Sequence, residues 1–264
     1  MPTPPPDTIA ILEQSPRRGH SLPVQFVDLL IIELSNWRWG WRSMVIIGMV
    51  FPLLSMMLLG SFARDLGNDA LAYILTGNIV LALLFEHQGK LTSHFSFMRM
   101  AGALDYFATL PVQKMVLILA AWAAFFILFI PVLLTTLVGG MLILHVELHL
   151  HPLALIVVPL CALPLAGVGA LIGTSFRTPE EANAVDRLLT VLMLALGPVL
   201  VQPERLPSWL VTRATSARPP TPPALRQVFL GPVTNRLILD LAVLIVFTVV
   251  SFWLVNHKMD WRAA

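Results

Sequence analysis

Charged side chains are scarce in this sequence. Asp, Glu, Lys and Arg make up 12% of its 264 residues, whereas a soluble domain carries about 25%. The net charge is only +2, and no stripe of Lys and Arg could follow a phosphate backbone, which excludes nucleic-acid binding. Apolar residues make up 57% and the mean hydropathy is +0.80. This composition predicts an integral membrane protein.

Two kinds of chemical site are also missing. Cys161 is the only cysteine, so an intrachain disulfide and a cysteine-based metal site are excluded. A phosphate-binding loop needs a glycine five residues before its Gly-Lys pair. The only such pair is Gly89-Lys90, and Leu84 stands at the position that glycine would occupy. We therefore expect no catalytic residue and no cofactor, and any ATP hydrolysis must belong to another chain.

Long apolar windows predict an all-α integral membrane fold. About 20 apolar residues are needed to cross the hydrocarbon core as a helix. Six windows qualify or nearly qualify, and each is flanked by charged or polar residues: 43–63, 70–88, 115–141, 152–176, 185–201 and 237–256. We expect residues 22–262 to form one transmembrane domain, and the Pro-rich residues 1–21 to be a disordered tail.

The Lys and Arg distribution predicts the orientation. With the N-terminus inside, the inner segments hold eleven of the 17 Lys and Arg residues, as the positive-inside rule requires. The exception is the outer loop between the fifth and sixth spans, which holds five of the other six. With six spans, both termini are predicted to be cytoplasmic.

The segment before the first span predicts an amphipathic elbow helix lying on the inner leaflet. Its apolar face contains Phe26, Leu29, Leu30, Leu34, Trp37 and Trp41, and Arg38 lies on the opposite, polar face. Glu33 interrupts the apolar face. Tryptophan beside arginine is typical of the headgroup layer. The alternative is a loosely amphipathic linker.

The connecting segments carry further signals. Residues 87–114 form an inner loop that is too apolar for a flexible linker and predicts short helices. Thr178, Pro179 and Glu181 occupy the cap, first and third positions of a helix start. Gly169 and Gly173 form a small-x-x-x-small pair that favours close helix packing. In the outer loop 202–236, two short apolar patches are candidates for re-entrant helices, and no structure is predicted for the Pro-rich residues 212–224.

The same sequence suggests three other kinds of function. His145, Glu147, His149 and His151 alternate as on a strand that could bind a metal, but a polar outer turn between the third and fourth spans is the favoured explanation. Glu180 and Glu181 resemble the glutamate pair of an intramembrane protease, but its other catalytic residues have no counterpart here. An ion-coupled transporter would bury ionisable residues in its spans, and only Asn78 and Glu86 come near that. A pore or scaffold without a motor is a further alternative.

The order of these parts resembles the membrane subunits of the ABC type-2 permease family, which export drugs, lipids and polysaccharides. Residues 73–77 (YILTG) are similar to the family's Y-L-x-x-G opening of the second span. Residues 102–106 (GALDY) with 109–112 (TLPV) are similar to its G-x-L-D/E-Y and x-x-P-V signature. Residues 206–210 (LPSWL), 224–226 (ALR) and 259–262 (MDWR) match its later motifs.

The resemblance implies a subunit of the plasma (inner) membrane that dimerises with itself or with a sister permease and binds two separate ATPase subunits. It also implies a substrate path between the two permeases, lined by spans one, two and five. Residues 98–111 would transmit ATPase motion, through Met98, Gly102, Leu104, Asp105, Tyr106 and Pro111. The alternative for this segment is a loop folded back on the chain's own spans.

Overall fold

The computed structural model describes residues 21–63, 67–146, 151–196, 221–229 and 236–258, and within them it is helical, without a strand. This confirms the predicted all-α class. In chain order the helices are α2 (Leu22–Asn36), α3 (Trp41–Ala63), α4 (Asn68–Leu83), the π-helix η2 (Leu84–Gly89), α5 (Lys90–Met100), α6 (Ala103–Thr109), α7 (Lys114–Leu144), α8 (Ala154–Ser175), α9 (Pro179–Leu196), α11 (Thr221–Phe229) and α12 (Arg236–Lys258).

Five helices in the described residues are long and apolar enough to cross a membrane. They are Trp41–Phe62, Ala70–Met100, Lys114–Leu144, Ala154–Ser175 and Leu237–Lys258, and each has at least 22 residues. These five indicate a membrane protein and correspond to five of the six predicted spans. The remaining predicted span, 185–201, begins inside α9, and its part from residue 197 onward lies outside the described residues.

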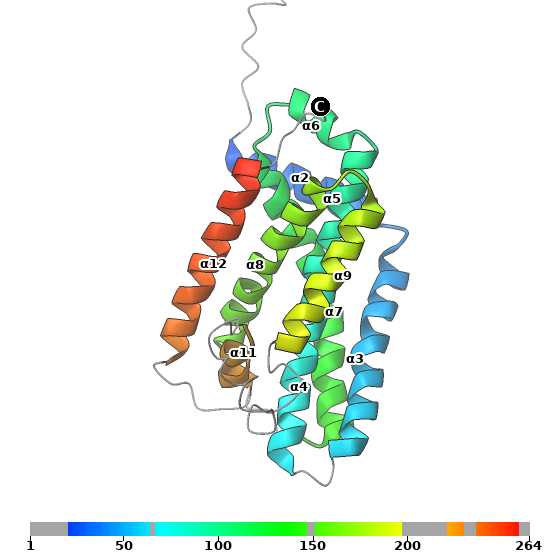
Figure 1. Cartoon of the computed structure of the whole chain (residues 1–264), viewed down its shortest axis with the longest axis vertical. Helices are drawn as coiled ribbons and strands as arrows, with labels where there is room; N and C mark the ends of the chain where they lie inside the picture. Colours follow the sequence, from blue (N-terminus) through cyan, green and yellow to red (C-terminus); the bar gives the residue numbers. More distant parts are fainter. Residues whose placement is uncertain (1–20, 64–66, 147–150, 197–220, 230–235, 259–264) are drawn as a thin grey trace, which may run out of the picture.

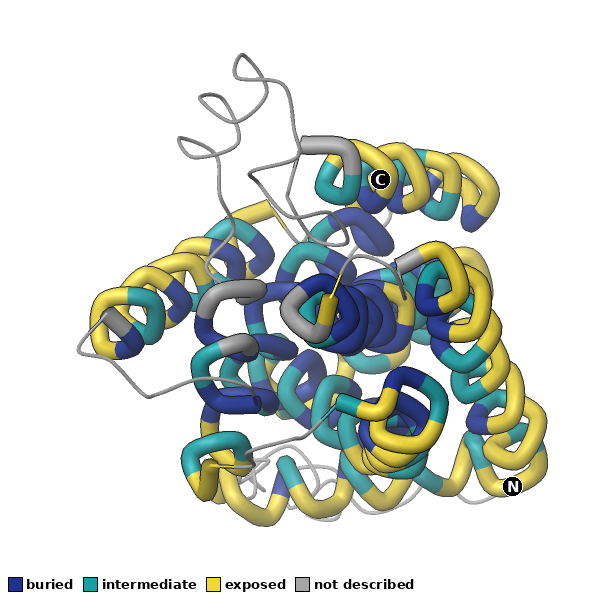
Figure 2. Tube along the Cα trace, turned by 90° about the horizontal axis from the view of Figure 1, so that it is seen from below, coloured by how far each residue is buried: buried dark blue, intermediate teal, exposed yellow. Residues whose placement is uncertain are grey.

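The helices form a bundle in which the axes of the long helices are nearly parallel (Figure 1). The Ala70–Met100 helix is central, with 83% of its apolar window buried, whereas only 22% of the window in α3 and 17% of that in α12 are buried. Figure 2 shows the same pattern, with exposed residues on the outer sides of the rim helices. Exposed side chains such as Ile47, Phe62 and Ile238 would be unfavourable in water and suit a lipid surface.

The second long helix runs past its predicted end. We expected the span to end at residue 88 and a loop to follow, but the helix continues through η2 and α5 to Met100. Polar residues such as Gln88, Thr92 and Ser96 lower the hydropathy there. They recur every four residues and so lie on one face of the helix. These side chains are buried on the side that α8 covers, where protein groups replace water as hydrogen-bond partners.

Glycines allow α8 to lie directly against this helix. A Cβ atom at Gly169 would lie 2.5 Å from the carbonyl oxygen of Gln88, and one at Gly173 would lie 2.6 Å from that of Thr92. No side chain larger than hydrogen fits between the backbones at these two positions. Both residues were predicted to be packing positions, and the structure places them where α8 contacts η2 and α5.

Two helix ends follow their sequence signals. Thr178 Oγ1 accepts a hydrogen bond from the Glu181 backbone N–H at 3.2 Å, so the predicted cap at the start of α9 is confirmed. Gly102 lies between α5 and α6 with φ of +69°. This left-handed conformation favours glycine, and it turns α6 across the end of the bundle where α2 also lies (Figure 1).

Candidate functional site

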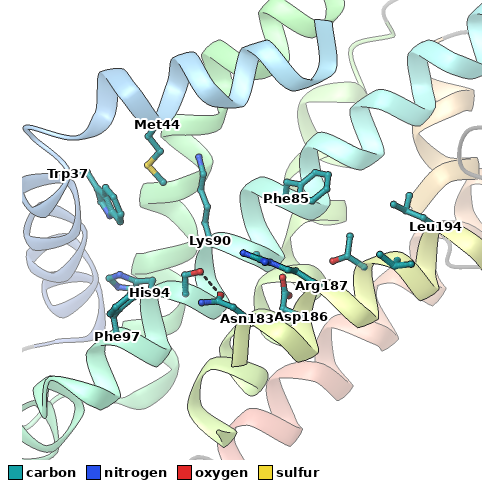
Figure 3. Close-up of a pocket in the computed structure, with 14 residues that line it drawn as sticks. Trp37, Met44, Phe85, Lys90, His94, Phe97, Asn183, Asp186, Arg187 and Leu194 are labelled. Atoms are coloured by element: carbon teal, nitrogen blue, oxygen red, sulfur yellow. Dashed lines mark hydrogen bonds between the residues drawn. The ribbon is translucent and has the colours of Figure 1, made fainter. Parts of the chain in front are cut away.

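The described residues line an open cavity of about 880 Å³ between α5 and α9, bounded on a third side by the turn after α2 and the start of α3. Figure 3 shows its walls converging from these elements. The lining residues combine aromatic and aliphatic side chains with polar and charged ones: Trp37, Met44, Phe85, Gly89, Lys90, Ser93, His94, Phe97, Asn183, Asp186, Arg187, Thr190, Val191 and Leu194.

Polar side chains of α9 pair with those of the second long helix along one wall. Asp186 Oδ1 lies 3.1 Å from both Gln88 Nε2 and Thr92 Oγ1, and each of these groups can donate to it. Ser93 Oγ donates to Asn183 Oδ1 at 2.7 Å. Asn183 and Asp186 are three residues apart, so they lie on one face of α9. This polar face of α9 packs against the second long helix, which explains why it carries a buried carboxylate.

An ion pair lies at the edge of the cavity. Lys90 pairs with Glu86 one turn earlier on the same helix, and Glu86 is buried. Gly48 of α3 leaves room for this carboxylate, because a Cβ there would lie 2.7 Å from Glu86 Oε1. Lys90 and Phe85 also line a second cavity of about 320 Å³ between α3 and α4. The ammonium group therefore lies between two hollows.

Helix α2 packs its apolar face on the protein. Leu29 is buried in one core cluster with Phe125 of α7, and Phe26, Leu30 and Trp37 pack against that cluster. Residues expected to contact lipid thus contact the bundle. Glu33, which interrupts the apolar face, lies 3.1 Å from His94 Nε2. The position that broke the pattern has a specific polar partner.

The exposed surface at this end carries tryptophan and arginine. The Arg38 guanidinium lies over the Trp39 ring at 5.2 Å, and that of Arg42 lies over the Trp41 ring at 5.7 Å. Arg38 and Trp41 are both exposed. Cation–π pairs of this kind keep both side chains extended along the surface.

The residues expected to couple to an ATPase divide into buried and exposed groups. Leu104 is buried in the core cluster that also contains Leu29, and Met98 packs against it. Asp105, Tyr106 and Pro111 are exposed. Direct docking by Leu104, one of the sequence-based expectations, therefore does not fit its burial. Tyr106, which is 63% exposed, is the aromatic side chain available to a partner.

The histidine pattern forms no metal centre within the part of the chain described. Residues 147–150, which include two members of the predicted set, lie outside it. His145 is exposed, with φ of +55°. His151 Nδ1 accepts a hydrogen bond from the Leu153 backbone N–H at 3.3 Å. No group of three His, Cys, Asp or Glu side chains suited to a metal occurs in these residues.

Sequence reasoning missed most of the cavity. Lys90, His94 and Asn183 were placed in inner loops, and Asp186 and Arg187 were placed at the start of the fifth predicted span without a role. The signal that could have found the helix extension was the Gln88-Thr92-Ser96 spacing, since a polar side chain on every fourth residue indicates a helix face. Comparison with known proteins adds no relative: no protein-family model matches the chain, and no curated protein matches it significantly.

Proposed function

We propose that this chain is the membrane subunit of an ATP-driven exporter of the ABC type-2 permease class. The observation that carries the proposal is the composition of the cavity walls. Its lining residues come from α3, from η2 and α5, and from α9. Met44 lies in the first predicted span, Phe85 in the second and the residues from Asp186 to Leu194 in the fifth, the three spans that the resemblance implies line the substrate path. The α5 residues lie on the extension of the second long helix.

The assignment includes six membrane spans, with the predicted span 185–201, which begins in α9, as the fifth. It also includes α2 as an elbow helix at the cytoplasmic surface and both termini inside the plasma membrane. Exposed Trp39 and Trp41 beside arginine support this placement of α2, because such pairs suit the headgroup layer. Labelling tests the orientation. In a Cys161→Ser background, Ser216→Cys is expected to react with a membrane-impermeant maleimide added outside, and reaction only from the inside would overturn the span count.

The partners are a separate ATPase and a second permease subunit. Helix α6 presents exposed Tyr106 at the same end as α2, as a cytoplasmic contact would require. Hydrolysis is expected only with the partner, so the purified chain has no ATPase activity. The test is reconstitution in liposomes with a separate ABC ATPase subunit. ATP-dependent export of an amphipathic substrate supports the proposal, whereas ATP hydrolysis by the lone, contaminant-free chain would overturn it.

A second candidate function is favoured by one observation. Glu86, Lys90 and Asp186 lie within the bundle, where ionisable groups are typical of ion or proton coupling. An ion-coupled transporter would move substrate in liposomes holding this chain alone, driven by an imposed pH or sodium gradient. Uptake that follows the gradient and needs no ATPase would decide for this alternative.

A further inference from the structure

The large cavity has a polar end and an apolar end. Its α9 wall runs from Asn183 to Leu194, and eleven steps of the helical rise span about 16 Å. Helix α9 begins at the end of the bundle that carries α2 (Figure 1), and Asn183, Asp186 and Arg187 lie in its first half. Val191 and Leu194 follow further along α9, and Phe85 lies on the same side of the close-up as Leu194 (Figure 3). A ligand that fills this space has a polar group at one end and an apolar body at the other.

The polar end carries the cations Arg187 and Lys90, the Asn183 amide and one carboxylate, that of Asp186 beside Arg187. Arg187 forms no ion pair with any residue that the structure describes, and its side chain extends toward Lys90 from the facing helix (Figure 3). Asn183 uses its carbonyl oxygen to accept from Ser93, which leaves its N–H donors for the cavity. Asp186 already accepts from Gln88 and Thr92.

The charges therefore favour an anionic group. Lys90 is held near Glu86, but an ammonium has three donors, and Lys90 lines the cavity whereas Glu86 does not. Arg187 adds the planar guanidinium that matches phosphate and carboxylate oxygens. Two cations and an amide facing one space are suited to a phosphate.

The apolar end and its surroundings point to a lipid. The outer faces of α3 and α9 beside the cavity are apolar and exposed, as Ile46, Leu188 and Leu192 show, so acyl chains are the natural neighbours of this opening. The volume of about 880 Å³ lies within the range of about 300–1,000 Å³ found for ligand sites. The adjoining hollow lined by Ile47 and Phe51 extends the apolar space beyond Phe85.

We propose that the cavity binds an anionic membrane lipid, with its headgroup phosphate between Lys90 and Arg187 and its chain along Phe85, Val191 and Leu194. The proposal that the lipid binds here is supported by the shape and lining of the cavity alone. The further step, that this lipid is the exported substrate, rests on the proposed function.

The test is lipid binding to the purified chain in detergent micelles, followed by native mass spectrometry. Palmitoyl-oleoyl phosphatidylglycerol is the anionic probe and the matching phosphatidylcholine is the zwitterionic one. Both lipids carry the phosphate, but phosphatidylcholine adds a quaternary ammonium that Lys90 and Arg187 repel. Phosphatidylglycerol is therefore expected to bind about tenfold more tightly. Excess inorganic phosphate is not expected to displace it, because phosphate lacks the apolar chain; displacement would assign the site to a free anion and overturn the lipid proposal.

Arg187→Gln is expected to abolish the preference for phosphatidylglycerol. The matched control is Arg177→Gln, which removes the same charge from an exposed position outside the cavity and is expected to keep the preference. A second variant, Lys90→Gln with Glu86→Gln, removes the other cation without leaving a buried carboxylate unpaired. Protection of Cys161 from thiol reagents verifies folding. If Arg187→Gln fails this check, the double variant replaces it, and it too is expected to lose the preference for phosphatidylglycerol.

Equal binding of the two lipids, or equal loss in the Arg177 and Arg187 variants, would overturn the proposal in favour of general surface electrostatics. No ATPase takes part in this measurement. Failure of lipid binding is therefore distinguishable from failure of the exporter assignment, which shows as absent ATP-dependent transport.

Discussion

Replacement of Gly173 by alanine tests the backbone contact between α8 and α5. The added Cβ would lie 2.6 Å from the carbonyl oxygen of Thr92 and 2.9 Å from Phe95 Cβ. Both neighbours belong to a central helix that is itself packed on several sides, so the two helices must move apart. Overpacking of this kind costs about 1–3 kcal/mol. At about 2–4 °C per kcal/mol for a chain of this size, the unfolding midpoint is expected to fall by about 2–12 °C.

Cys161 supplies the assay without engineering. It is the only cysteine, it lies on α8 about three turns before Gly173, and none of its surface is exposed. A maleimide dye that fluoresces on reaction with a thiol therefore reports unfolding when the protein is heated in detergent micelles. Midpoints are compared at one heating rate, because unfolding of such proteins is often irreversible.

Gly40→Ala is the matched control. A Cβ at Gly40 meets only Trp37 Cε3, at an ordinary distance of 3.7 Å, so the same chemical change is expected to leave the midpoint unchanged. If Gly173→Ala unfolds at the same temperature as the unaltered chain, α8 and α5 are not in backbone contact. If Gly40→Ala lowers the unfolding midpoint as much as Gly173→Ala does, the decrease reflects glycine replacement in general.

Three further predictions use the same thermal assay. Gly102→Ala is expected to lose about 1–2 kcal/mol, because φ of +69° strains any side chain; an unchanged midpoint would place the turn in another conformation. Lys90→Gln alone is expected to cost more than Lys90→Gln combined with Glu86→Gln, because the single change leaves a buried carboxylate unpaired, a loss of about 3–5 kcal/mol; additive losses would contradict the ion pair. Leu104→Ala, at 4% exposed, is expected to cost about 2–5 kcal/mol, whereas Tyr106→Ser is expected to change stability by at most about 0.5 kcal/mol and to weaken ATPase binding. A larger loss of stability in Tyr106→Ser than in Leu104→Ala would make Tyr106 the packing residue.

The long helices could be predicted because their physical cause is local. The apolar run before Arg64, and the run that follows Lys114, each exceed the length needed to cross a bilayer, and the structure has α3 and α7 there. The extension to Met100 could not be read from hydropathy, since Glu86 and Lys90 look like the end of a span when each is counted alone. Their charges are tolerated because they pair with one another.

The candidate site depends on information that the sequence does not carry locally. Lys90 and Arg187 are separated by nearly a hundred residues, and only the packing of α9 against α5 brings them to one cavity. Glu33 shows the same limit on a smaller scale. Its position on the helix wheel was correctly seen as an interruption, but its partner His94 is on another helix.

The π-helical turn η2 has a consequence for how this gene can change. A π turn accommodates one residue more than an α turn by bulging locally, so the helices on either side keep their faces aligned. Loss of a single codon between Leu84 and Gly89 would restore an ordinary α turn and leave α4 and α5 facing their present neighbours. The same loss inside α5 would rotate everything beyond it by about 100° and turn buried side chains such as Phe95 away from α8. Single-codon deletions in the second long helix are therefore expected to survive selection in the η2 segment rather than on either side of it.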